Sequence, residues 1–114
     1  MIKKHIEERP WGSFERFCEN DVCTVKIITV NANEEISLQY HKHRDEFWKV
    51  LQGKPKLIIG NKTVEAKEGE EFFVSKGTKH RITSGKETVK VLEIAFGKFD
   101  EDDIVRLEDR YKRK

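Results

Sequence analysis

The sequence predicts an all-β sandwich or barrel, and three observations support this fold class. Short runs rich in β-branched and aromatic residues recur along most of the chain, at roughly ten-residue spacing. Residues suited to turns, such as Gly53, Gly69 and Gly77, separate these runs. The 114 residues are a usual length for one domain. We therefore expect an N-terminal arm (residues 1–8) followed by a single domain (residues 9–114).

The expected strands can be followed from the N-terminus. Residues 13–18 and 22–30 lie on either side of Asn20-Asp21, which predicts a hairpin between them. A short strand is expected from residue 36. The remaining strands are expected at residues 47–51, 55–59, 62–66, 71–74, 80–83 and 88–96. Only the tail, about residues 102–111, is compatible with a helical turn.

Composition argues against nucleic-acid and membrane partners. The net charge of +2 is the difference between 23 basic and 21 acidic residues, so no strong field attracts polyanions. No apolar run approaches the roughly 20 residues of a membrane span. The first residues lack the apolar core of a signal peptide. We therefore expect a cytoplasmic protein that binds a small molecule.

Two cysteines, Cys18 and Cys23, flank the expected turn at Asn20-Asp21. A disulfide across such a hairpin is geometrically conceivable. Because the chain shows no export signal, two free thiols are expected instead.

The stretch from Gln39 to Glu46 concentrates residues that bind metals. On an extended chain, Gln39, His41 and His43 share one face, because side chains alternate along a strand. An Arg-Asp pair then predicts a bend, after which Glu46 can turn back towards the same space. A further ligand is expected from His80, which follows a glycine-containing turn at the start of another strand. The alternative is a set of polar residues on a half-exposed sheet with no ligand.

These two stretches resemble the paired motifs of the cupin superfamily, in which His-x-His-x3,4-Glu is followed by a second histidine. With His41 and His43 as the first pair, only two residues would precede Glu46, whereas Gln39 and His41 leave four. The ligands that the resemblance implies are Gln39, His41, Glu46 and His80. Zinc is the first expectation for this set, and Mn, Co, Ni or Fe also suit it.

A closer resemblance is to the C-terminal cupin domain of type II phosphomannose isomerases, usually found behind a mannose-1-phosphate guanylyltransferase domain. Residues 9–14 (RPWGSF), 37–48 and 101–111 carry it, with Phe47 at a position where a histidine is expected. The resemblance implies an all-β, double-stranded β-helix (jelly-roll, cupin) barrel with a short C-terminal tail. It also implies metal-dependent interconversion of mannose 6-phosphate and fructose 6-phosphate.

Aldose–ketose isomerisation also needs a base and a phosphate anchor. His43 is one candidate base, and its alternative role is to orient Glu46 or the substrate. Glu93 is the other candidate: it faces the barrel interior if Val91 and Ala95 do, and solvent in the opposite register. Arginines within or near the matched motifs could bind the phosphate. Those expected to do so are Arg44, Arg106 and Arg110.

Two other functions are compatible with the same residues. One is a sugar-phosphate-binding module without turnover that pairs with a separate guanylyltransferase. The other is a metal-dependent oxygenase or a different isomerase, because one fold hosts many chemistries. A homodimer is expected in any case, because Leu92, Ile94 and Phe96 form an apolar face on the outside of the sheet.

Overall fold

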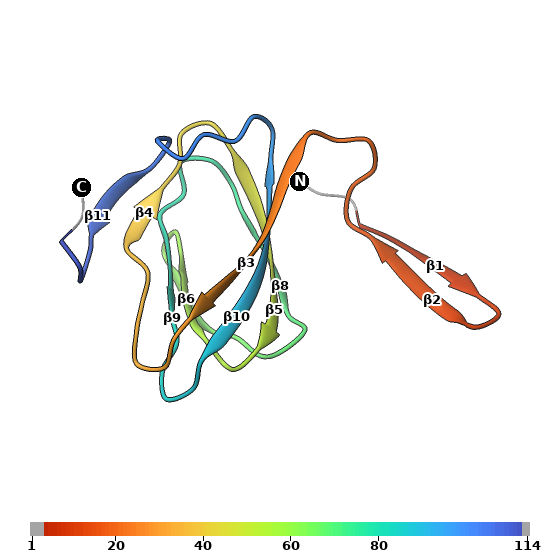
Figure 1. Ribbon diagram of the computed structural model, residues 1–114, viewed down its shortest axis with the longest axis horizontal. Helices are drawn as coiled ribbons and strands as arrows, with labels where there is room; N and C mark the ends of the chain where they lie inside the picture. Colours follow the sequence, from red (N-terminus) through yellow and green to blue (C-terminus); the bar gives the residue numbers. More distant parts are fainter. Residues whose placement is uncertain (1–3, 113–114) are drawn as a thin grey trace.

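Two β-sheets packed face to face form the body of the protein, and a separate hairpin projects from it (Figure 1). A computed structural model describes residues 4–112. Its strands are β1 (His5–Arg9), β2 (Gly12–Arg16), β3 (Cys23–Val30), β4 (Leu38–Tyr40), β5 (Asp45–Gln52), β6 (Lys56–Ile59), β7 (Lys62–Glu65), β8 (Glu71–Val74), β9 (His80–Thr83), β10 (Val89–Phe96) and β11 (Val105–Glu108). The described residues contain no helix able to span a membrane. The predicted all-β class is confirmed.

The sheets interleave strands that are distant in sequence. One sheet has the order β3-β10-β5-β8, the other β11-β4-β9-β6-β7, and the pairs within them are antiparallel. The strand predictions from residue 47 to residue 96 agree with β5 to β10 within two residues at each end. Runs of β-branched and aromatic residues separated by glycine-containing turns were therefore sufficient to define these strands.

Side-chain alternation on β5 and β10 determines what enters the barrel. Glu93 pairs with Trp48 and Val91 pairs with Val50, so these four side chains share the inner face. All four are buried, whereas Lys90 is exposed. Of the two registers that the sequence left open for Glu93, the structure has the inward one. The inner face is thus lined by apolar side chains around Val50 and by carboxylates near the start of β5.

Two predictions of local structure are wrong. The segments expected to pair as a hairpin separate: β2 pairs with β1, and β3 pairs along its whole length with β10. β1 has mostly exposed side chains and lacks the hydrophobic alternation that predicts a strand. The tail forms β11 in place of a helical turn, because Val105 pairs with Tyr40. Residues 1–3 of the expected arm and 113–114 of the expected domain lie outside the described residues.

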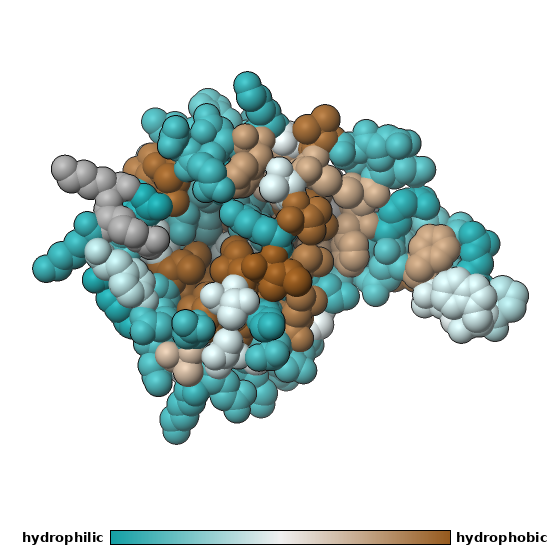
Figure 2. Space-filling model, in the orientation of Figure 1, coloured by the Kyte–Doolittle hydropathy of each residue, from teal (hydrophilic) through white to brown (hydrophobic). Residues whose placement is uncertain are grey.

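The outer face of the β3-containing sheet is only partly covered. Ile94 is buried, and Leu92 and Phe96 are half-buried. On the neighbouring edge strand β3, Val25 and Ile27 are 56% and 57% exposed. Figure 2 shows hydrophobic surface over the middle of the barrel, where β3 crosses the view. A second copy could cover this face, and the homodimer stays a prediction.

Candidate metal centre

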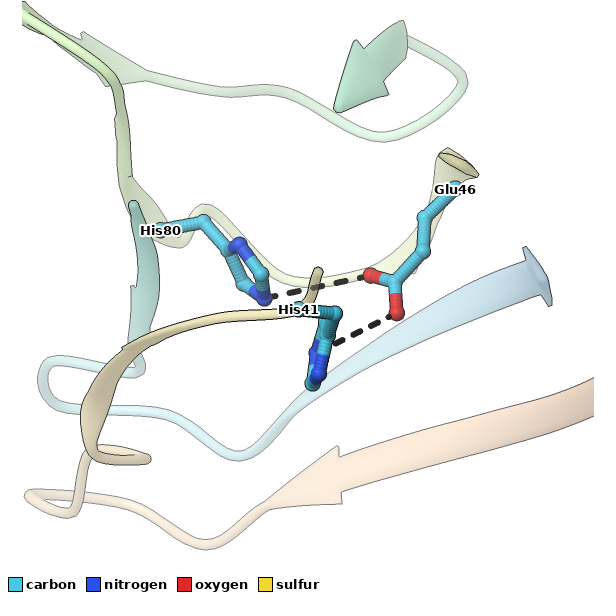
Figure 3. A group of neighbouring side chains, drawn as sticks. All are labelled: His41, Glu46 and His80. Carbon is cyan, nitrogen blue, oxygen red and sulfur yellow. Dashed lines mark ion pairs between the residues drawn. The ribbon is translucent and has the colours of Figure 1, made fainter. Parts of the chain in front are cut away.

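Three buried side chains converge at one end of the barrel interior. His41 directly follows β4, Glu46 is the second residue of β5, and His80 begins β9. Figure 3 shows the Glu46 carboxylate beside both imidazoles, with a dashed line to each. His41 Nε2 lies 3.4 Å from Glu46 Oε2, and His80 Nε2 lies 3.9 Å from Glu46 Oε1. The three candidate ligand atoms all lie within 4.8 Å of one another.

Backbone carbonyls fix the tautomer of both histidines. His41 Nδ1–H donates to the Asp103 carbonyl at 2.6 Å, and His80 Nδ1–H donates to the Thr78 carbonyl at 2.9 Å. A carbonyl oxygen can only accept, so Nδ1 carries the proton in each ring. Nε2 is therefore the unprotonated nitrogen of each ring, and it lies beside the Glu46 carboxylate. This orientation is usual for histidines that bind metals.

Burial keeps both imidazoles neutral. It lowers the pKa of His80 to about 4, outweighing the backbone hydrogen bond to Thr78, which raises it. Burial lowers the pKa of His41 as well, against the opposing effect of its bond to Asp103. Metal ligation requires neutral imidazole and ionised carboxylate. Two neutral imidazoles beside one carboxylate therefore fit a divalent transition metal such as zinc.

Two further side chains hold the Glu46 carboxylate in place. Trp48 Nε1–H donates to Oε1 at 3.1 Å, and Arg44 Nε–H donates to Oε2 at 2.9 Å. Arg44 also donates from Nη2 to His41 Nε2 at 3.1 Å. Arg44 is itself buried, and its guanidinium lies over the Phe99 ring with 4.4 Å to the centroid. The cluster therefore contains atoms that can ligate a metal cation and, beside them, a guanidinium held in a fixed position.

Gln39 and Arg106 lie in the same cross-strand row as His80. Gln39 pairs with His80 across β4 and β9, and Arg106 pairs with Gln39 across β11 and β4. Directly opposed residues of an antiparallel pair point to the same face. Gln39 is half-buried and donates from Nε2 to the Ser37 carbonyl at 3.4 Å. Both side chains thus face the interior from the five-stranded sheet.

Glu93 brings a second carboxylate to the same interior. It is 4% exposed, and its Oε1 has no hydrogen-bond partner among the described residues. The Lys26 ammonium lies 3.5 Å from Oε1. Burial, followed by the charge of neighbouring Glu46, raises the pKa of Glu93 to about 7. A carboxyl group poised near neutral pH can accept and return a proton.

The family of the chain follows from its sequence over nearly the whole length. The family model described as mannose-6-phosphate isomerase C-terminal matches residues 1–109. The chain belongs to this family.

A relative agrees with this assignment, and solved structures share the fold. The mannose-1-phosphate guanylyltransferase ManC of Salmonella typhimurium is 36% identical over 107 residues, 92% of this chain and 22% of ManC. The chain thus spans about a fifth of this curated relative. A Klebsiella pneumoniae protein with a double-stranded β-helix domain has a TM-score of 0.66 at 22% identity, over 80% of this chain and 78% of the other. The cupin domain of Schizosaccharomyces pombe Cnp3 has a TM-score of 0.63 at 20% identity, over 85% and 88%. These structures confirm the cupin, double-stranded β-helix fold.

Two of the residues that the sequence analysis placed at the site lie away from the cluster. His43 does not share the face of His41, because β4 ends at Tyr40 and the chain bends; His41 is buried and His43 is exposed. His43 lines a shallow cavity of about 330 Å³ together with acidic residues of the β10–β11 loop. Arg110 donates to the Asn33 carbonyl at 2.8 Å, on the surface. The catalytic role of His43 and the phosphate-binding role of Arg110 stay predictions that this arrangement does not favour.

The structure also explains Phe47, which stands where the isomerase C-terminal family is expected to have a histidine. Phe47 points to the outer face, opposite to Glu46, and its ring centroid lies 5.2 Å from that of Phe17. Its side chain therefore cannot reach a substrate at the buried cluster.

Sequence reasoning missed the hydrogen bonds that His41 and His80 donate to the carbonyls of Asp103 and Thr78, since a backbone carbonyl has no side-chain signature.

Proposed function

We propose that this domain is a cytoplasmic, metal-dependent aldose–ketose isomerase of nucleotide-sugar biosynthesis that interconverts mannose 6-phosphate and fructose 6-phosphate. The observation that carries the proposal is the buried cluster of His41, Glu46 and His80, with both Nε2 atoms directed at the carboxylate and Glu93 in the same interior. These three residues would hold the metal, with Gln39 as a fourth ligand. Zinc is the first choice.

A divalent metal bound there would polarise the sugar carbonyl and so acidify the neighbouring C–H bond. Glu93 is the base that the geometry favours, because it is buried in the same interior and its Oε1 accepts no hydrogen bond among the described residues. It would take the proton from C2 of mannose 6-phosphate and return it to C1 of the resulting enediol. O1 gains a proton as the enediol forms, and O2 loses its hydroxyl proton as C1 is protonated. The net change moves one hydrogen from C2 to C1 and one from O2 to O1, without loss of atoms or electrons.

Arg106 is the best placed of the expected phosphate anchors. It lies on the inner face in the row of Gln39 and His80, and its Nε atom is buried. Guanidinium groups bind phosphate through paired donors. Arg44 contacts Glu46 and His41 directly, so it would bind substrate oxygen near the reacting carbons.

The proposal is tested by a coupled isomerase assay on chelator-stripped protein, with Zn, Mn, Co and Ni added back. Activity should return with metal and be lost in His41→Ala. The matched control is His5→Ala, because His5 is exposed on β1 and belongs to the projecting hairpin. Metal-loaded protein without turnover above His41→Ala would refute the isomerase.

The second candidate is a sugar-phosphate-binding module that partners a separate guanylyltransferase. The name of the 36% identical relative, a guanylyltransferase, favours this interpretation. Calorimetric titration with mannose phosphates separates the two functions. Binding without turnover supports the module, and turnover excludes it as a complete description.

A further inference from the structure

The loop between β10 and β11, residues 97–104, is attached to the segment that carries His41. Phe99, within this loop, lies under two cations: Arg44 at 4.4 Å and Lys26 at 4.9 Å from its ring centroid. Arg44 also donates from Nη1 to the Asp100 carbonyl at 3.4 Å. The loop therefore packs directly on the metal-ligand cluster.

Asp103 makes the most specific contacts of this loop. Its Oδ1 accepts the Lys42 amide N–H at 2.9 Å, and its Oδ2 accepts the His43 amide N–H at 3.0 Å. Its backbone carbonyl accepts the His41 Nδ1–H at 2.6 Å. One residue thus binds three successive residues of the ligand segment, twice through its carboxylate and once through its main chain.

These contacts have different consequences. The carbonyl bond determines which nitrogen of His41 carries the proton, and so which nitrogen can bind a metal. The carboxylate bonds cannot set the tautomer themselves, but they hold the Asp103 main chain beside His41. Because β4 ends at Tyr40, His41 lies outside the regular ladder and lacks the support that β9 gives His80.

We propose that Asp103 is the positioning residue of the metal centre: its carboxylate clamps the Lys42–His43 backbone, so that its carbonyl fixes His41 with Nε2 directed at Glu46. The inference deepens the proposed function and rests on its metal site. It assigns a role to the acidic motif before β11 that the isomerase chemistry itself does not use.

Two substitutions at Asp103 remove its carboxylate hydrogen bonds to different extents, and substitutions at the neighbouring Asp102 are the controls. Asp103→Ala removes both carboxylate bonds, whereas Asp103→Asn retains one acceptor and so one of the two bonds. Asp102 lines the same cavity, and its carboxylate makes none of these contacts, so Asp102→Ala and Asp102→Asn are matched controls. Circular dichroism and the melting temperature verify that each variant is folded.

The first measurement is zinc affinity by competition with a chromogenic chelator. Loss of a residue that orients a ligand histidine typically weakens metal binding about 10–100-fold. We expect a loss in this range for Asp103→Ala, a smaller loss for Asp103→Asn, and wild-type affinity for both Asp102 variants. Wild-type affinity in Asp103→Ala, or an equal loss in Asp102→Ala, would overturn the inference.

The second measurement needs no metal and no activity. Nitrogen-15 NMR of the imidazole of His41 in metal-free protein should report the Nδ1–H tautomer in wild type and in Asp102→Asn. In Asp103→Asn, the signal should shift towards a mixture of tautomers. Asp103→Asn keeps one of the two carboxylate bonds, so it is the variant to measure if Asp103→Ala does not fold. An unchanged tautomer would refute the role of Asp103. Wild-type protein that binds no zinc would instead refute the metal site, and the two failures are thereby distinguished.

Discussion

The two ends of the barrel interior are built from the same strands but differ in chemistry. β5 contributes Val50 at one end and Glu46 at the other, and β10 contributes Val91 opposite Val50 and Glu93 nearer Glu46. The apolar end buries hydrocarbon, which stabilises the fold. The polar end buries groups whose charged forms are costly away from water. The apolar end therefore stabilises the fold, whereas the polar end reduces its stability.

The largest effect should come from Glu93→Gln at the polar end. A glutamine side chain has nearly the same shape as glutamate but no basic carboxylate, so the isomerisation rate should fall about 10²–10⁴-fold. Stability at pH 8 should be equal or higher, because the buried charge beside Glu46 is removed. The measurements are the coupled assay and urea unfolding. His43→Gln should retain activity within about tenfold, and a larger loss there would favour His43 as the base.

The opposite result is expected from Leu57→Ala at the apolar end. Leu57 is fully buried and pairs with Ile82, so truncation should cost about 2–5 kcal/mol of unfolding free energy. Zinc affinity of the folded fraction should not change. Leu51→Ala is the control, since Leu51 is 41% exposed and should lose much less. Weakened zinc binding in Leu57→Ala would show that the two ends are not independent.

The apolar end was also the part most accessible from sequence. Short apolar and β-branched runs between turn residues predict strands such as β8 and β9 with their observed bounds. The pairing of β3 with β10 was missed, since contacts between residues so distant in sequence leave no local pattern.

The polar end could be predicted only in part. His41, Glu46 and His80 follow from residue type and spacing, and the structure brings them together. The error over the facing of His43 arose because alternation was extended beyond the end of β4. The role of Asp103 could not be anticipated, because its key contact to His41 uses a backbone carbonyl.

In the metal-free protein, His80 and Glu93 at the polar end should have opposite effects on how the unfolding free energy depends on pH. Burial lowers the pKa of His80 to about 4 from 6.5, so the unfolded chain binds the extra proton and stability falls as the pH falls between these values. Burial raises the pKa of Glu93 to about 7 from 4.5, so the folded state binds the extra proton and this contribution falls as the pH rises. Between about pH 4.5 and 6.5 the two slopes oppose each other.

Glu93→Gln should therefore reveal the pH dependence of stability that comes from His80 alone of this pair. With chelator present, its unfolding free energy should fall more steeply than that of wild type as the pH is lowered from 6.5 to 4.5, by up to about 1.4 kcal/mol per pH unit. Urea unfolding at several pH values provides the measurement. Glu87→Gln, at an exposed position, is the control and should follow wild type. If the unfolding free energy of Glu93→Gln and of wild type changed equally with pH, the proposed opposite effects of His80 and Glu93 would be wrong.

The smallest effect is expected from Phe47→His. This substitution tests whether the outer face of β5 contributes to activity as the inner face is proposed to do. Glu46 and Trp48 face the cluster, whereas Phe47 packs against Phe17 on the other side of the sheet. Activity should change less than about threefold, because successive residues of a strand point to opposite faces. Stability should fall by about 1 kcal/mol, as for a typical substitution, since an imidazole replaces part of an apolar contact. Phe47→Leu keeps the contact apolar and should preserve both quantities better. A large gain of activity in Phe47→His alone would mean that the outer face of β5 contributes to catalysis, and the division of roles between the two faces would then be wrong.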